Sequence, residues 1–241
     1  MIDKRIFPPL LDENRLDFPD IDEAITYRDG LVAIGGDLSY ERLLVAYSLG
    51  IFPWYNKKDP ICWWALSPRM VLYPQELYVG RSLKKSIRSQ SYCVKVNCAF
   101  EQVVACCAQK KRKGQNGTWI HAEMEDAYRQ MYLHGNAHSF EYWQNDQLLG
   151  GLYGVQIGRV FFGESMFALV DNASKIAFVH AVDFLRNSGV ALIDCQMYTD
   201  HLARFGASEI EFSVFKQQLA INSVLPLLQP ITSGILYENI H

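Results

Sequence analysis

The chain has 241 residues, a formal net charge of −3, 49% hydrophobic residues and 20% charged residues. This length suffices for one large domain or two modest ones, and the balance is typical of an ordinary soluble globular protein. Because the overall charge does not attract phosphate, contact with nucleic acid would need a local basic patch. The N-terminus lacks the apolar segment of a signal peptide, and no run approaches the roughly 18 apolar residues of a membrane span. We therefore expect a cytoplasmic protein with no membrane partner.

The spacing of potential metal and cofactor residues excludes several kinds of site. The six cysteines form no zinc ribbon or CxxC pair, and the six histidines form no HExxH motif. No Walker loop or GxGxxG motif follows a predicted strand. We expect no metal and no nucleotide cofactor, and we expect the cysteines to be small buried residues in a reducing compartment.

The first 67 residues are rich in Pro, Gly and turn signals. Ser39 is expected to cap a short helix that Gly50 ends, and Pro53 then prevents helix in the segment that follows. We interpret residues 1–67 as a small α+β domain that packs against a second domain, residues 68–241.

Residues 68–241 alternate strands and helices. Strands are expected at Met70–Tyr73, Cys93–Asn97, Ser139–Gln144, Gln147–Gln156, Arg159–Gly163 and Val190–Asp194. The turn Asn145–Asp146 predicts a hairpin, and Asn172 is expected to cap a helix from Ala173 to Arg186 that Gly189 ends. Antiparallel strands followed by a helix and another strand indicate an α+β domain with a mixed sheet.

Two clusters of basic residues lie among these predicted strands and helices. Arg81, Lys84, Lys85 and Arg88 fall at i, i+3, i+4 and i+7, so a helix would place them in one stripe. A loop cluster of Lys110, Lys111, Arg112 and Lys113 follows. Cations without interspersed carboxylates favour a phosphate backbone, and a merely solvated helix face is the alternative.

Two acidic residues stand beside apolar runs. Asp194 ends an apolar strand, and if the strand continues, Gln196 points the same way. The carboxylate would then orient the Gln196 carboxamide, whose oxygen would accept a hydrogen bond from an incoming amine. Glu164 lies among aromatic residues and Met166, where it would suit an ammonium group beside an apolar pocket. The alternatives are an Asp that caps a turn and a surface Glu on an edge strand.

Trp54 and Trp119 suit either core packing or stacking on a nucleic-acid 3′ end. Asn172 to Lys175 form a polar block, in which Ser174 is expected to contact substrate. Lys175 lies in the first helical turn, against the preference of the helix dipole, which favours a functional role.

In combination these blocks are specific. The order LVAIGGDLS, GIFPWY, TWI, GGLYG, FGESMF, NASK and IDCQ resembles that of the leucyl/phenylalanyl-tRNA–protein transferases, over about Gly30 to Phe215. The chain departs from that pattern where WWALSPR (63–69) replaces the usual WWSPxPR. It also departs at Ala181, where a relative has a larger aromatic residue, so the preference between Leu and Phe is left open.

The resemblance implies a bacterial cytosolic enzyme of the N-degron pathway, with a GCN5-type acetyltransferase-like domain after a small family-specific domain. It would move Leu or Phe, and Met less readily, from aminoacyl-tRNA to an N-terminal Arg or Lys. The resemblance also implies site residues. Trp54 and Trp119 lie near the terminal adenosine, Glu164 lies near the aminoacyl amine, and Asp194 and Gln196 assist peptide-bond formation. The pocket for the Leu or Phe side chain is implied to consist of Leu152, Phe161, Met166, Ala181 and Ile193.

Two rival functions stay open at this point. An acyl-CoA-dependent N-acetyltransferase would share the fold, but it needs a glycine-rich phosphate loop, which residues 169–175 lack. A non-catalytic adaptor that binds tRNA or reads N-termini is the second rival. The joint presence of Asp194, Gln196 and Glu164 argues against it.

Overall fold

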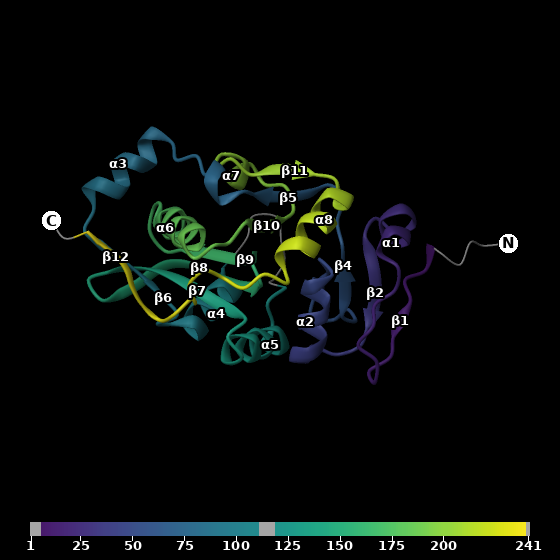
Figure 1. Ribbon diagram of the computed structural model, residues 1–241. Coiled ribbons are helices and arrows are strands. Elements are labelled where there is room, and N and C mark those ends of the chain that lie inside the picture. The colour runs from purple at the N-terminus through teal and green to yellow at the C-terminus, as the bar shows by residue number, and fades with distance from the viewer. Residues whose placement is uncertain (1–5, 111–118, 240–241) are drawn as a thin grey trace.

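Two mixed β-sheets organise the computed structural model, which describes residues 6–110 and 119–239 (Figure 1). The smaller sheet has the order β1-β2-β4-β3. Its strands are β1 (Leu10–Leu11), β2 (Leu31–Gly35), β3 (Phe52–Pro53) and β4 (Cys62–Trp64). The larger sheet has the order β11-β5-β10-β9-β8-β7-β6-β12. Its strands are β5 (Arg69–Leu72), β6 (Tyr92–Val96), β7 (Ala137–Gln144), β8 (Gln147–Ile157), β9 (Val160–Ala168), β10 (Leu192–Gln196), β11 (Ser208–Ile210) and β12 (Gly234–Asn239).

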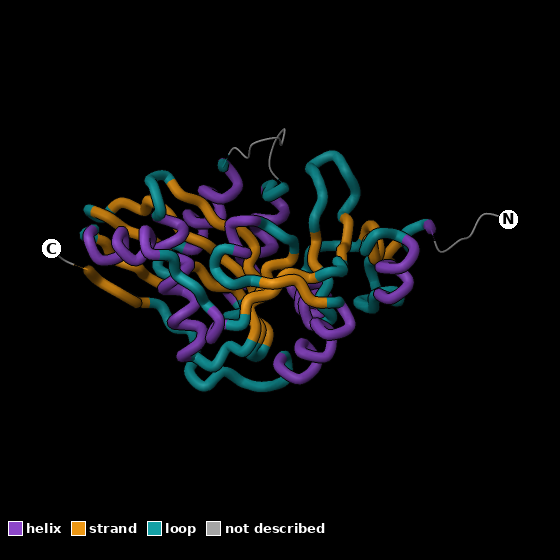
Figure 2. Tube along the Cα trace, turned by 90° about the horizontal axis from the view of Figure 1, so that it is seen from above, coloured by secondary structure: helices purple, strands orange, loops and turns teal. Residues whose placement is uncertain are grey.

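Helices cover both faces of the larger sheet. The helices are α1 (Ile21–Tyr27), α2 (Tyr40–Ser48), α3 (Arg81–Ser89), α4 (Phe100–Gln109), α5 (Ala122–Leu133), α6 (Ala173–Asn187), α7 (Asp200–Ala203) and α8 (Phe212–Asn222). Helix α6 packs on one face, and α4 and α5 pack on the other (Figure 1). The N-terminal elements gather at one end of the molecule, and α3 and β12 lie at the opposite end (Figure 1). Figure 2, a view from above, shows the two termini at opposite ends. Within the described residues, no helix combines the length and the apolar character that crossing a membrane requires.

Alternation along the strands creates two apolar cores. Tyr153 on β8 and Phe162 on β9 belong to the core that α4, α5 and the N-terminal elements share. Their neighbours Leu152 and Phe161 belong to the core under α6. Successive strand side chains point to opposite faces, so both faces of these inner strands are buried. The first core includes residues from Leu11 to Leu219, so the N-terminal elements share their packing with the large sheet.

The predicted α+β class with a mixed sheet is confirmed. In the larger sheet β9 and β10 pair in parallel, whereas the other neighbouring strands are antiparallel. The hairpin turn is confirmed, since Asn145 and Asp146 have φ values of 49° and 57°, as a two-residue turn of the favoured hand requires. Ser39 caps α2 by accepting a hydrogen bond from the Arg42 backbone N–H, as predicted.

Some local predictions are wrong. Asn172 has a left-handed φ of 62° and its side chain does not cap α6. Its amide instead accepts from Lys175 Nζ at 3.2 Å and donates to Ser86 Oγ at 3.3 Å. All six cysteines are free, as expected, but Cys107 alone among them is fully buried and Cys98 is exposed. Strand β9 also continues past Gly163 to Ala168, because it pairs with β8 over this length.

We predict that Gly150→Ala destabilises the fold. A Cβ at Gly150 would lie 2.6 Å from the Cβ of Ala173 and 3.0 Å from the Ser174 backbone nitrogen, at the start of α6. Overpacking of this kind typically costs about 1–3 kcal/mol. Urea unfolding should show that loss for Gly150→Ala, whereas Gly80→Ala, which has no heavy atom within 4 Å, should change little. Equal stability of both variants would mean that α6 does not depend on this close approach.

Candidate active site

The candidate site opens where the parallel strands β9 and β10 separate. Their pairing joins Val160–Phe162 to Leu192–Asp194. Beyond this register, Gly163 to Met166 of β9 and Cys195 and Gln196 of β10 line one cavity. Diverging strands leave room for a ligand between rigid elements, and such concave sites are the usual places for small-molecule binding.

A buried ion pair joins β5 to β10 beside this cavity. Arg69 on β5 donates from Nε to Asp194 Oδ1 at 2.8 Å and from Nη2 to Asp194 Oδ2 at 2.5 Å. Both side chains have 0% exposure. The guanidinium also lies 4.8 Å from the ring centroids of Phe52 and Phe215. A buried charge must be paired, and a bidentate pair is the strongest arrangement available to a carboxylate and an arginine.

The Asp194 carboxylate also fixes the backbone at Gln196. Asp194 Oδ1 accepts a hydrogen bond from the Gln196 backbone N–H at 2.8 Å, and Gln196 has a left-handed φ of 61°. The register with β5 shifts between these two residues. Strand β10 extends to Gln196, as expected, but its register is irregular there. The prediction that Asp194 holds the Gln196 carboxamide is wrong, because Asp194 accepts from the Gln196 backbone N–H instead. Asp194 supports a turn, as the alternative interpretation held, and it is bound to Arg69 as well.

Glu164 holds the Gln196 carboxamide instead. Gln196 Nε2 donates to Glu164 Oε1 at 3.1 Å. Tyr47 donates to Oε1 at 2.7 Å, and Tyr128 donates to Oε2 at 2.6 Å. The surface-residue alternative for Glu164 is wrong, because β9 is an inner strand between β8 and β10. With Nε2 engaged, the Gln196 carboxamide oxygen is left to accept from a ligand.

Burial is the main electrostatic influence on Glu164. It raises the pKa of this carboxyl from 4.5 to about 7, although the hydrogen bonds from Tyr128 and Tyr47 favour the ionised form. The negative charge of Asp194 adds to the increase, and Arg69 opposes it. Glu164 therefore changes charge near neutral pH, as expected of a group poised for proton-dependent binding or chemistry.

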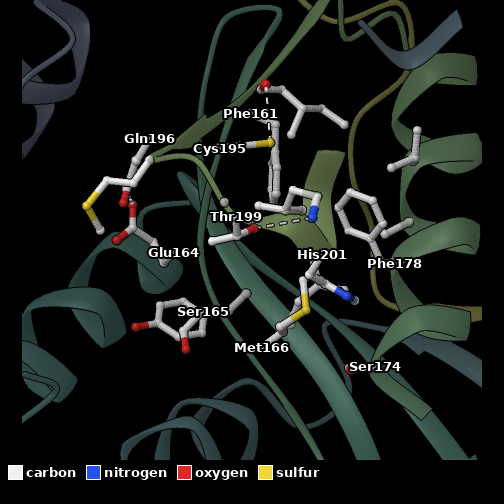
Figure 3. A pocket seen from close by; sticks show the side chains of 18 of the residues that line it. Phe161, Glu164, Ser165, Met166, Ser174, Phe178, Cys195, Gln196, Thr199 and His201 are labelled. Carbon is white, nitrogen blue, oxygen red and sulfur yellow. Dashed lines mark hydrogen bonds between the residues drawn. The ribbon is translucent and has the colours of Figure 1, made fainter. Parts of the chain in front are cut away.

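Asp194, Gln196, Glu164, Tyr47 and Tyr128 together form a polar cluster. An apolar cavity of about 500 Å³ extends from this polar cluster to α6. Seven predicted substrate residues line it together, namely Leu152, Phe161, Glu164, Met166, Ser174, Ala181 and Ile193. Phe178, Val182 and Leu185 of α6 complete the apolar wall. Figure 3 shows Phe161 and Phe178 within the cavity and Glu164 beside Gln196. The cavity is suited to an apolar side chain whose polar end remains near Glu164 and Gln196.

Trp54 and Trp119 meet in a second, smaller cavity of about 80 Å³. It shares Glu164, Gln196 and Met197 with the larger cavity, so the two open onto the same polar cluster. Both tryptophans are half-buried. They pack against the shared core and also line this cavity.

The basic residues of α3 line neither of these two cavities. Arg81, Lys84, Lys85 and Arg88 are exposed on α3, as the predicted helical stripe requires. Lys110 lines the large cavity, and its Nζ donates to the Met166 carbonyl at 3.2 Å. Lys111, Arg112 and Lys113 lie outside the described residues. In the described part of the chain, no group of three or more His, Cys, Asp or Glu could hold a metal ion.

Sequence reasoning did not assign the residues that position the polar cluster. Arg69 is 125 residues from Asp194, Tyr47 is 117 residues from Glu164, and Tyr128 is 36 residues from Glu164. An arginine that begins the wholly buried strand β5 is the one local signal, because Arg is almost never buried unpaired. Nothing in the local pattern of Tyr47 or Tyr128 distinguishes them from core tyrosines.

Known proteins resemble this chain along most of its length. The family model described as leucyl/phenylalanyl-tRNA protein transferase matches residues 71–220, and the model of that family's N-terminal domain matches residues 36–67. A leucyl/phenylalanyl-tRNA–protein transferase of Anaeromyxobacter sp. (strain K) is 54% identical over 203 residues, which cover 84% of this chain and 86% of the relative.

More distant relatives carry the same name. The protein of Chromobacterium violaceum is 52% identical over 205 residues, or 85% of this chain and 88% of its own length. That of Neisseria meningitidis serogroup C is 48% identical over 228 residues, or 92% and 95%. The chain belongs to the leucyl/phenylalanyl-tRNA protein transferase family.

Proposed function

We propose that this chain transfers Leu or Phe, and Met less readily, from aminoacyl-tRNA to the N-terminal Arg or Lys of acceptor proteins, which marks them for N-degron degradation. The observation that carries the proposal is the apolar cavity that ends at Glu164 and Gln196, in a chain of this family. The aminoacyl side chain enters the cavity, and its ester stays at the polar cluster. Phe178 and Ala181 of α6 line the part of the cavity that receives the ring of Phe or the isobutyl group of Leu.

The reaction is an aminolysis of an ester. The acceptor α-amine attacks the aminoacyl carbonyl, a C–N bond forms, and the C–O bond to the terminal ribose breaks. The amine loses a proton, and the ribose oxygen gains one. The ester is already activated, so holding the amine and ester together is the main requirement, and proximity can contribute roughly 7–11 kcal/mol.

Gln196 is the residue that contacts the attacking amine in this proposal. Its carboxamide oxygen accepts from the amine, because Nε2 is engaged by Glu164. Asp194 has no exposure and is therefore a positioning residue, which acts through the Gln196 backbone. Glu164 lies within reach of a cationic amine and holds the carboxamide in place.

The remaining residues bind the tRNA. Trp54 and Trp119 stack on the terminal adenosine beside the polar cluster, since aromatic faces bind single-stranded bases without regard to sequence. The α3 stripe and Lys110–Lys113 contact phosphates. The protein acts in the cytosol, where its charged tRNA is made, and its free cysteines agree with a reducing compartment.

We also propose that residues 68–241 form a GCN5-type acetyltransferase-like catalytic domain behind a small domain of residues 1–67. The parallel pair β9–β10, which separates at the site, supports that fold. Acetyl-CoA is a poor fit, because residues 169–175 at the start of α6 lack phosphate-loop glycines and Asp171 would repel a pyrophosphate.

The transfer itself is the first functional prediction. Labelled Leu-tRNA or Phe-tRNA should label a peptide with N-terminal Arg or Lys without added ATP, metal or CoA. A peptide of the same sequence with N-terminal Glu is the matched control and should stay unlabelled. Labelling from acetyl-CoA with no response to charged tRNA would contradict the proposal, and tRNA binding without transfer would favour the adaptor.

The second functional prediction concerns the polar cluster. Gln196→Ala and Asp194→Asn should each lower single-turnover transfer from preloaded Leu-tRNA by about 10²-fold, the low end for a positioned proton-handling group. The double variant should be little worse, because residues that act as a unit are not additive. Asn is chosen because it keeps the shape of Asp194 and an oxygen that can accept from the Gln196 backbone N–H. It still removes the counter-charge of buried Arg69, so the fold of the variant is checked by its unfolding before transfer is compared. Binding of charged tRNA should be unchanged, as in the remote control Gln144→Ala.

Near-wild-type transfer by both folded single variants would leave Asp194 and Gln196 a structural role. Catalysis would then rest on proximity and on the neighbouring ribose hydroxyl.

The third functional prediction uses the raised pKa of Glu164. Since the folded pKa of about 7 exceeds the ordinary 4.5, the protonated carboxyl stabilises the fold below about pH 4.5, and this stabilisation is lost as pH rises through 7. Relative to Glu164→Gln, the wild type should lose on the order of 2 kcal/mol of unfolding free energy between about pH 5 and pH 8. Chemical unfolding at several pH values measures this difference.

The exposed Glu209→Gln on β11 is the control for the pH series and should track the wild type. If the unfolding free energy of Glu164→Gln also changes with pH as that of the wild type does, Glu164 does not titrate near neutral pH.

A further inference from the structure

A second large cleft, of about 810 Å³, lies beside the apolar cavity. The start of α3, the start of α6 and helix α7 enclose it. Arg81 enters it from α3, Lys175 from α6, and Arg204 from the end of α7. None of these elements is joined to another by a short loop, so the fold itself brings the three cations together.

The cleft is electropositive. Three cations face it, and Asp200 is the one carboxylate in its lining. Within the described parts of the chain, no ion pair engages Arg81, Lys175 or Arg204, and Lys175 Nζ has a neutral partner, Asn172 Oδ1. Asp200 accepts a hydrogen bond from the Tyr198 hydroxyl at 3.1 Å.

The pKa of His201 is consistent with this positive potential. Burial is the largest cause of the lowered pKa of His201, and the positive charges of Lys175, Lys110 and Arg204 lower it further. Lys175 also occupies the first turn of α6, where the helix dipole disfavours a cation unless an anion lies nearby. The cleft is therefore built to receive negative charge.

Its position connects two surfaces already described. Arg81 belongs both to the α3 stripe and to the cleft, and His201 lines both the cleft and the apolar cavity. From there, exposed Met197 and Tyr198 lead to the tryptophan cavity, which Met197 lines. A basic groove followed by exposed aromatic surface is the usual arrangement for a single strand of nucleic acid.

We propose that this cleft binds the backbone phosphates of the unpaired 3′ end of the charged tRNA, between the α3 stripe and the tryptophan cavity. Lys175 and Arg204 are its phosphate-binding residues, and Arg81 connects it to the stripe. The inference rests on the proposed function, because it takes aminoacyl-tRNA as the donor.

Three leucine donors of decreasing length test this. They are Leu-tRNA, the leucyl ester of the trinucleotide CCA, and the leucyl ester of adenosine, which has no phosphate. The variant Lys175→Ala/Arg204→Ala should lower kcat/KM about tenfold or more with the first two donors, with a weaker salt dependence. It should retain wild-type kcat/KM with leucyl-adenosine, which also shows that the variant folds.

The matched control is Lys84→Ala/Lys85→Ala on α3, two cations outside the cleft lining. It should impair Leu-tRNA and leave the trinucleotide donor unaffected, because the stripe contacts the body of the tRNA.

Two results would overturn the inference while the proposed function stands. One is normal use of leucyl-CCA by Lys175→Ala/Arg204→Ala, and the other is an equal loss with leucyl-adenosine. If the wild type transfers leucine from none of the three donors, the proposed function fails, and the inference fails with it.

Discussion

The buried pair between Arg69 and Asp194 is the interaction on which the site depends. It joins β5 to β10 at the point where β10 leaves its parallel neighbour β9. The same carboxylate accepts from the Gln196 backbone and so holds a left-handed residue that costs free energy by itself. An apolar replacement of a buried ion pair often stabilises a fold as well or better, so the contribution of this pair lies in the geometry that it gives to Gln196.

Residues that are far apart in the sequence hold the polar cluster in place. Tyr47 comes from α2 and Tyr128 from α5, and both donate to Glu164 on β9. Phe52 of the small sheet and Phe215 of α8 enclose the Arg69 guanidinium. The N-terminal elements therefore help to shape the site directly, and damage to their packing is transmitted to Glu164 and Arg69.

Local patterns predicted the elements better than they predicted the contacts. Helix α6, the basic stripe of α3 and the β7–β8 hairpin follow from periodicity and turn chemistry, because these features are encoded within a few residues. The apolar cavity residues were found through the family blocks, and the structure places them together. The partners of Asp194 and Gln196 were assigned wrongly, because a left-handed residue and a bond to distant Arg69 leave little trace in the strand pattern.

The central claim is that the aminoacyl group lies in the cavity between α6 and β9, with its reacting end at Gln196. A crystal structure with 3′-leucylamido-adenosine, whose amide resists aminolysis, tests this most directly. We expect the leucine side chain among Phe161, Phe178 and Ala181, and the adenine against Trp54 and Trp119. A leucine side chain outside this cavity, or an adenine that does not contact either tryptophan, would contradict the account.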